Sequence, residues 1–114
     1  MKQLKVIVKI IDDKKGENIN IIDMSNISSL ASYYVICSVN SERQASAIAH
    51  EIEKELIENN LPYNHTEGKR NDSRWILVDA EDVIVHIFTN DERDVYDLDL
   101  LWADQPKIDY KRYL

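Results

Sequence analysis

The sequence feature that most constrains the fold is a strongly signalled helix that directly follows an apolar segment. Ser41 and Gln44 form a capping box, in which the serine side chain accepts a hydrogen bond from a backbone amide and the glutamine reaches back. Apolar residues then recur at helical spacing before Pro62: Ala45, Ile48, Ala49, Ile52 and Leu56. Residues 33–39 before the cap are mostly apolar and predict a buried strand. A helix that leaves a buried strand in this way typically crosses over to another strand, which predicts an α/β fold.

The other periodic segments extend this unit. Residues 2–15 have apolar positions at helical spacing, and residues 18–24 predict a strand. After the central helix we expect a strand over 63–67, a polar loop over 68–73, a strand over 74–79, a tight turn at residues 80–81 and a strand over 82–88. Asp91 and Glu92 then open a short turn or helix, and the fold closes with Leu98, Leu100, Leu101 and Trp102. The order predicts one α/β domain over residues 1–114 with a mixed sheet flanked by helices, a core over about 5–104 and a polar tail over 105–114.

Length and composition are those of a soluble globular protein. A chain of 114 residues forms one domain, and 44% hydrophobic with 31% charged residues is ordinary. The longest apolar runs are far too short to span a bilayer, and the N-terminal residues do not resemble a secretory signal. The single Cys37 cannot form an internal disulfide and reads as a small buried hydrophobe. We therefore expect a cytoplasmic protein with no membrane partner.

Negative charge is concentrated in one segment. Residues 79–104 hold nine carboxylates and one base, Arg93, for a net charge of −8, whereas the rest of the chain carries +1. Charge placed this unevenly belongs on the protein surface, where it indicates a basic partner. Trp75, Tyr96 and Trp102 accompany the acids and are residue types that anchor protein–protein contacts. The alternative is that the acids serve solubility and the tryptophans belong to the core. The acidic balance argues against direct binding to nucleic acid, which needs a basic surface.

Two groups of residues carry side chains that could be catalytic. Ser41 lies at a strand-to-helix corner, where nucleophiles and phosphate-binding loops occur, but no glycine lies between Cys37 and Arg43 to allow close backbone approach. Asp97 and Asp99 could hold magnesium, yet on a helix they point about 200° apart. We predict a protein that is not an enzyme; the alternative is a nucleotidyltransferase-like enzyme that uses Ser41, Asp97 and Asp99.

A third group of residues carries side chains that could bind a metal ion. Asp79, Asp82 and His86 carry the right ligand types, but Asp82 and His86 would lie roughly 13 Å apart along one strand. Turn chemistry accounts for the two aspartates, and a histidine on a buried strand face is commoner than a ligand. We therefore predict no metal and no cofactor.

Residues spread over about 5–104 resemble those of a known family, in the right order and spacing. They are Asp23, Tyr34-Val35-Ile36, Ser41, Arg43, Gln44, Ala47-Ile48-Ala49, Glu67-Gly68, Trp75, Leu77, Asp79, Asp82-Val83, Val85-His86, Phe88, Arg93, Tyr96-Asp97-Leu98 and Leu101-Trp102. The pattern resembles the ribosomal silencing factor family, the Iojap-related group called RsfS. The resemblance implies a nucleotidyltransferase-like α/β fold without catalysis and a homodimer. It also implies docking onto the fourteenth protein of the large ribosomal subunit. This docking would block the joining of the two subunits and so repress translation when nutrients are scarce.

The chain departs from the family pattern at two positions. The family usually has glycine at the position of Val39 and another near Glu81. The first departure weakens a nucleotide-binding interpretation further, and the second makes the hairpin tip more acidic. Combining the resemblance with the charge pattern, we predict seven residues that contact the basic ribosomal protein: Trp75, Asp79, Asp82, Arg93, Tyr96, Asp99 and Trp102. We place Asp79 and Asp82 at the hairpin tip.

Overall fold

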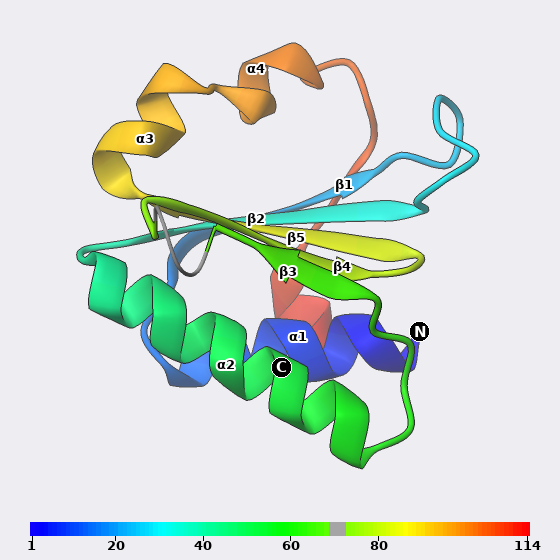
Figure 1. Ribbon diagram of the computed structural model, residues 1–114. Coiled ribbons are helices and arrows are strands. Elements are labelled where there is room, and N and C mark those ends of the chain that lie inside the picture. Colours follow the sequence, from blue (N-terminus) through cyan, green and yellow to red (C-terminus); the bar gives the residue numbers. More distant parts are fainter. Residues whose placement is uncertain (69–72) are drawn as a thin grey trace.

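The computed structural model describes residues 1–68 and 73–114, and within them six strands form one mixed sheet (Figure 1). The strands are β1 (Glu17–Asp23), β2 (Tyr33–Val39), β3 (His65–Glu67), β4 (Trp75–Ala80), β5 (Val83–Thr89) and β6 (Lys107–Ile108). Their order is β3-β4-β5-β2-β1-β6; β2 and β5 are parallel, and the other neighbours are antiparallel. The predicted α/β class with a mixed sheet is confirmed. The predicted polar loop over 68–73 lies mostly outside the described residues.

Helices cover the two faces of the sheet unequally. The helices α1 (Lys2–Asp13) and α2 (Glu42–Glu58) pack on one face and bury the larger apolar cluster. The short helices α3 (Asn90–Val95) and α4 (Leu98–Leu101) lie on the other face, where only four fully buried apolar residues gather among those described: Ile22, Met24, Ile36 and Phe88. None of the helices in the described ranges has the length and apolar content needed to traverse a bilayer.

The predicted cap of the central helix is confirmed. Ser41 Oγ accepts a hydrogen bond from the backbone N–H of Gln44 at 3.1 Å. The glutamine carbonyl accepts from the N–H of Asn40 at 3.0 Å, one residue earlier than in the usual capping box. Its amide also donates to the backbone oxygens of Lys14 and Lys15, each at 3.1 Å. One side chain therefore joins the end of α1 to the start of α2.

The first helix ends two residues earlier than the predicted range of 2–15. Its last residue is Asp13, and Lys15 adopts a positive φ of 68°. Gly16 follows and donates its N–H to the carbonyl of Ile11 at 2.8 Å. A Cβ at Gly16 would lie 2.4 Å from Ile11 Cγ2, so close packing requires the glycine at this position.

The hairpin turn lies one residue later than predicted. Ala80 pairs with Val83, so the two-residue connection is 81–82 rather than 80–81. Glu81 has a φ of 68°, in the left-handed region that favours glycine. Asp79 Oδ1 accepts from the N–H of Glu81 at 2.9 Å and stabilises this conformation.

The C-terminal segment that we expected to be a polar tail is part of the fold. Residues 107–108 form the edge strand β6, which pairs with β1, and Tyr110–Tyr113 form a 3-10 helix. Ile108, Tyr110 and Tyr113 pack against the larger apolar cluster. The sequence lacks a signal for this because the apolar residues are few and their segments are shorter than one period of a regular pattern.

Candidate functional site

The face that carries α3 and α4 presents polar and aromatic residues that come from three neighbouring strands. Because side chains alternate across a strand, every second residue of each strand points to this face. The set is Tyr34, Ile36 and Ser38 from β2; Trp75, Leu77 and Asp79 from β4; and Ile84, His86 and Phe88 from β5. We call this surface, with α3 and α4, the α3–α4 face.

The three aromatic residues predicted to be anchors lie on this face. The Trp75 ring stacks on Phe88 with centroids 4.9 Å apart and also contacts Tyr96, 4.7 Å away. Trp102 packs against the same smaller apolar cluster. Trp75 and Trp102 are half-buried and Tyr96 is 47% exposed. The tryptophans therefore pack against the core and still reach the surface. They agree in part with both interpretations of the sequence, core residues and anchors for a partner.

His86 is buried at the centre of the aromatic residues. Its Nδ1 accepts a hydrogen bond from Trp75 Nε1 at 3.2 Å, which leaves the proton of the neutral ring on Nε2. Within the described residues, Nε2 is a buried side-chain atom without a hydrogen-bond partner. Such an atom typically costs about 1–3 kcal/mol of stability. Burial also lowers the pKa of His86 to about 4, so the imidazole is neutral at pH 7. The sequence favoured a histidine on a buried strand face over a metal ligand, and the structure agrees with that position, but the hydrogen bond to Trp75 was not predicted.

Arg93 and Asp99 form a clamp that holds α3 and α4 on the sheet. Arg93 Nε and Nη2 donate to the two carboxylate oxygens of Asp99 at 3.0 and 3.1 Å. Arg93 Nη1 donates to Ser38 Oγ at 2.9 Å and to the backbone oxygen of Asn18, and Asn20 donates to Asp99 at 2.7 Å. Burial alone would raise the pKa of Asp99, but the hydrogen bonds and the arginine charge outweigh it and hold the pKa below its usual value. Both residues therefore have structural partners.

The two hairpin carboxylates differ in their surroundings. Asp82 is exposed in the turn, as predicted. Asp79 belongs to β4 and accepts hydrogen bonds from the N–H of Glu81 at 2.9 Å and from Asn64 Nδ2 at 3.2 Å. Its second oxygen lies 3.8 Å from His65 Nδ1. Asp79 is therefore engaged in the hairpin, whereas Asp82 is available to a partner.

The residues of the alternative enzyme hypothesis have structural roles. Ser41 caps α2, Asp97 Oδ1 accepts from the N–H of Leu100 at 3.1 Å at the start of α4, and Asp99 belongs to the clamp. Cys37 is fully buried, and burial raises its pKa to about 12, which removes its nucleophilic form at neutral pH. In residues 1–68 and 73–114, no three His, Cys, Asp or Glu side chains lie together as a metal site would require.

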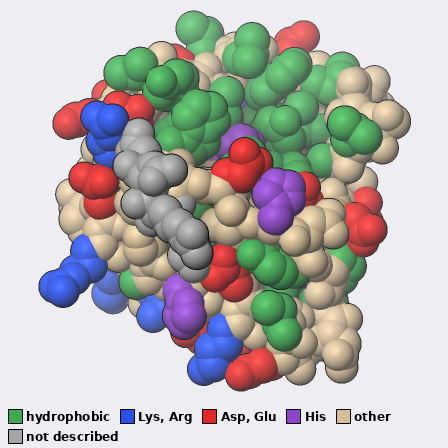
Figure 2. Space-filling model, viewed as in Figure 1, with side chains coloured by type: hydrophobic (Ala, Val, Ile, Leu, Met, Phe, Trp, Pro, Cys, Tyr) green, Lys and Arg blue, Asp and Glu red, His purple; other side chains and the backbone are tan. Residues whose placement is uncertain are grey.

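Exposed apolar side chains surround the aromatic residues. Of the nine large apolar residues exposed in the described ranges, six belong to the loop before β2 or to the α3–α4 segment: Ile27, Leu30, Val95, Tyr96, Leu100 and Leu101. Figure 2 shows apolar side chains gathered over the upper part of the molecule, where Figure 1 places α3 and α4. Such contiguous exposure on a soluble protein typically marks a contact surface.

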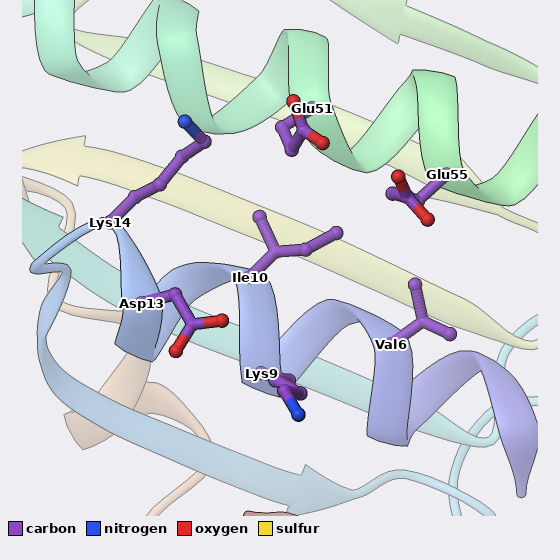
Figure 3. Close-up of a pocket in the computed structure, with 7 residues that line it drawn as sticks. All are labelled: Val6, Lys9, Ile10, Asp13, Lys14, Glu51 and Glu55. Atoms are coloured by element: carbon purple, nitrogen blue, oxygen red, sulfur yellow. The ribbon is translucent and has the colours of Figure 1, made fainter.

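A hollow between α1 and α2 is the other surface feature of note. Figure 3 shows Ile10 of α1, and Lys14 just after this helix, extending toward α2, which carries Glu51 and Glu55. Its lining mixes both signs of charge with few apolar side chains. Neither a strong field nor a buried unpartnered group distinguishes it, so the α3–α4 face is the better candidate.

Fold and site together define a small α/β domain with an acidic and aromatic surface on one face of its sheet. The sequence model described as "Ribosomal silencing factor during starvation" matches residues 1–113. The Ribosomal silencing factor RsfS of Bacillus subtilis is 44% identical over 106 residues, covering 93% of this chain and 89% of that protein. The chain belongs to the ribosomal silencing factor family, which confirms the resemblance seen in the sequence.

Solved and more distant relatives agree with this assignment. A crystal structure of a Bacillus halodurans protein superimposes with a TM-score of 0.82 at 39% identity, covering 95% of this chain and 97% of that one. A mouse protein named Mitochondrial assembly of ribosomal large subunit protein 1 is 28% identical over 103 residues, covering 88% of this chain but 45% of that protein. The family description names a silencing factor and no reaction.

Proposed function

We propose that this protein binds the large ribosomal subunit through its α3–α4 face, blocks the joining of the small subunit by steric hindrance and so represses translation. The observation that carries the proposal is the coincidence, on one face, of exposed apolar residues with the segment of net charge −8. Ribosomal proteins are basic, so this face is complementary in charge to them. Family membership and the name of the mouse relative support a role at the large subunit.

The predicted contact residues divide into two roles. Trp75, Tyr96 and Trp102 supply anchor area at the surface, and Asp82 supplies steering charge. Arg93, Asp99 and Asp79 act by positioning, because their polar atoms already have partners within the chain. The proposed partner is a basic protein of the large subunit, of the type of its fourteenth protein, and the proposed location is the cytoplasm. The protein acts without a cofactor.

Co-sedimentation with purified large and small ribosomal subunits, each alone, tests this function. The protein is expected to sediment with the large subunit only, and adding it before the small subunit is expected to reduce the yield of joined ribosomes. Binding to the small subunit alone would overturn the proposal. The enzyme alternative is tested by calorimetry with nucleoside triphosphates and magnesium. Micromolar, magnesium-dependent binding there would favour a nucleotidyltransferase.

Reversing the charge of the hairpin tip is expected to weaken binding by more than tenfold, or about 1.4 kcal/mol. The variant is Glu81→Lys with Asp82→Lys, because both side chains are exposed and Asp79, which supports the turn, stays intact. Affinity for the large subunit is measured by sedimentation at several salt concentrations. Salt should weaken the wild-type complex more than the variant complex, because the variant has lost the attraction that salt screens.

A matched control is Asp12→Lys with Asp13→Lys, which makes the same change of net charge at two adjacent exposed carboxylates. These residues end α1, on the opposite face of the sheet. The control is expected to bind within about threefold of wild type, because steering depends on where charge lies and not only on its total. Equal weakening in both variants would show that net charge alone matters and would place the docking face elsewhere.

Self-association is a second part of the proposal. The exposed side chains of Ile27 and Leu30 add apolar surface next to β2, and the family resemblance implies a homodimer. Light scattering at high micromolar concentration is expected to give the mass of two chains. A strictly monomeric mass would contradict this part and leave the proposed ribosome binding untouched.

A further inference from the structure

We infer that the Nε2–H group of His86 is a hydrogen-bond donor for the docking partner, which brings a carbonyl oxygen into the centre of the α3–α4 face. The inference rests on the proposed function and adds the chemistry of one contact to it. It starts from His86 Nε2, the buried side-chain atom that lacks a partner within the described residues. Buried polar groups in native proteins nearly always have partners, so an exception indicates a function.

The hydrogen bond to Trp75 determines what this atom offers. Trp75 Nε1 can only donate, so His86 Nδ1 must accept, at 3.2 Å. The ring proton is then on Nε2, so the Nε2–H group is a hydrogen-bond donor. The described part of the fold uses Nδ1 and leaves Nε2 unused.

The imidazole of His86 is buried, but its neighbours on the same face are partly exposed. His86 is 4% exposed, whereas its neighbours on the same face, Tyr34, Leu77 and Ile84, are all half-exposed. The Tyr34 ring lies 4.8 Å from the imidazole. A partner atom would reach Nε2 through a change of rotamer in such a neighbour, and rotamer changes of side chains are common at interfaces.

The surrounding charge selects the kind of acceptor. Asp79 projects from the same face of the sheet, and residues 79–104 carry a net charge of −8. A second carboxylate brought into this field would be repelled, whereas a backbone carbonyl or side-chain amide oxygen carries no net charge. A basic protein provides both the complementary charge and the neutral acceptor. Its cations can pair with the acidic side chains while one of its carbonyl oxygens accepts from His86 Nε2. We therefore assign the contact to the proposed basic protein of the large subunit, and not to a second copy of this acidic chain.

Two substitutions at one position separate the donor from the packing. In His86→Gln, the amide can accept from Trp75 and still donate outward, whereas His86→Leu fills similar space with no donor. The leucine variant is expected to bind the large subunit at least tenfold more weakly than wild type, and the glutamine variant within about threefold. Equal binding by the leucine variant and wild type would overturn the inference. It would leave the proposed function standing, because that fails only if wild type does not bind.

Nitrogen-15 NMR of the wild-type imidazole provides a readout that does not depend on a variant's folding. On adding the purified basic ribosomal protein, the Nε2–H proton should shift downfield and exchange more slowly with water. Unchanged signals in the complex would overturn the inference. Full protection in the free protein would also overturn it, since it would show that an ordered water already satisfies the donor. The same shift on raising the concentration of the protein alone would assign the contact to a second copy and contradict the partner proposed.

Discussion

Replacing Arg93 with methionine is expected to lower the free energy of unfolding by roughly 2 kcal/mol, because removing one partner of a partly buried ion pair leaves the other charged and unpaired. The Arg93 side chain is 13% exposed and donates to Asp99, Ser38 and the backbone oxygen of Asn18. Methionine fills much of the same volume but donates nothing, so the Asp99 carboxylate, which is 29% exposed in the wild-type protein, loses its compensating charge. Denaturant unfolding followed by tryptophan fluorescence measures the loss.

The matched control is Lys54→Met, which removes the same charge from an exposed position of α2. A change within about 0.5 kcal/mol is expected there. Combining Arg93→Met with Asp99→Asn should restore part of the lost stability, because neither partner is then left charged and unpaired. Purely additive losses in the double variant would contradict the clamp. So would a wild-type-like Arg93→Met.

Acidification from pH 6.5 to 4 is expected to lower the free energy of unfolding by up to about 3 kcal/mol through His86 alone. Burial lowers the pKa of this imidazole from 6.5 to about 4 in the folded protein. In that window the unfolded chain binds a proton that the folded chain excludes, so protonation favours unfolding. The stability is complete above pH 6.5 and is lost as pH falls toward 4. Urea unfolding at half-unit pH steps gives the slope.

The same measurement on His86→Gln should show a flatter profile over this window, because glutamine does not titrate and can still accept from Trp75. Any decrease in the free energy of unfolding below pH 4 has another origin. Asp23 and Asp99 have folded-state pKa values below 3.8, so their contributions are lost as pH falls below that value. An identical slope in wild type and variant between pH 6.5 and 4 would show that the His86 imidazole is not shielded from water.

Local patterns predicted most of the fold. The predicted helices and strands up to residue 89 agree with the structure within two residues, since each depends on periodicity and turn residues inside its own segment. Ser41 was identified as the cap because its partner Gln44 is three residues away. The hairpin turn was displaced by one residue because Glu81 occupies a conformation that its residue type does not signal.

The sequence predicted which residues belong to the candidate site better than it predicted their contacts. Trp75, Tyr96 and Trp102 do lie on one face, together with the acidic residues of α3 and α4. Arg93 and Asp99 were assigned to the partner, yet their hydrogen bonds reach Asn18, Asn20 and Ser38. Those partners are 55 or more residues away in the chain, so no local pattern could reveal them.

By itself, the sequence determined the α/β class, the capped helix, the uneven charge and the family, because these depend on residue order within short windows or on matched motifs. Only the tertiary structure decided which charged side chains are free at the surface and which form ion pairs within the protein, as the Arg93–Asp99 clamp shows. It also decided that His86 Nε2 has no hydrogen-bond partner among residues 1–68 and 73–114 and that its neighbours on the same face are partly exposed. The reason is that burial and hydrogen bonding are properties of packed strands and helices, and a side chain's partners come from wherever the fold brings the chain together.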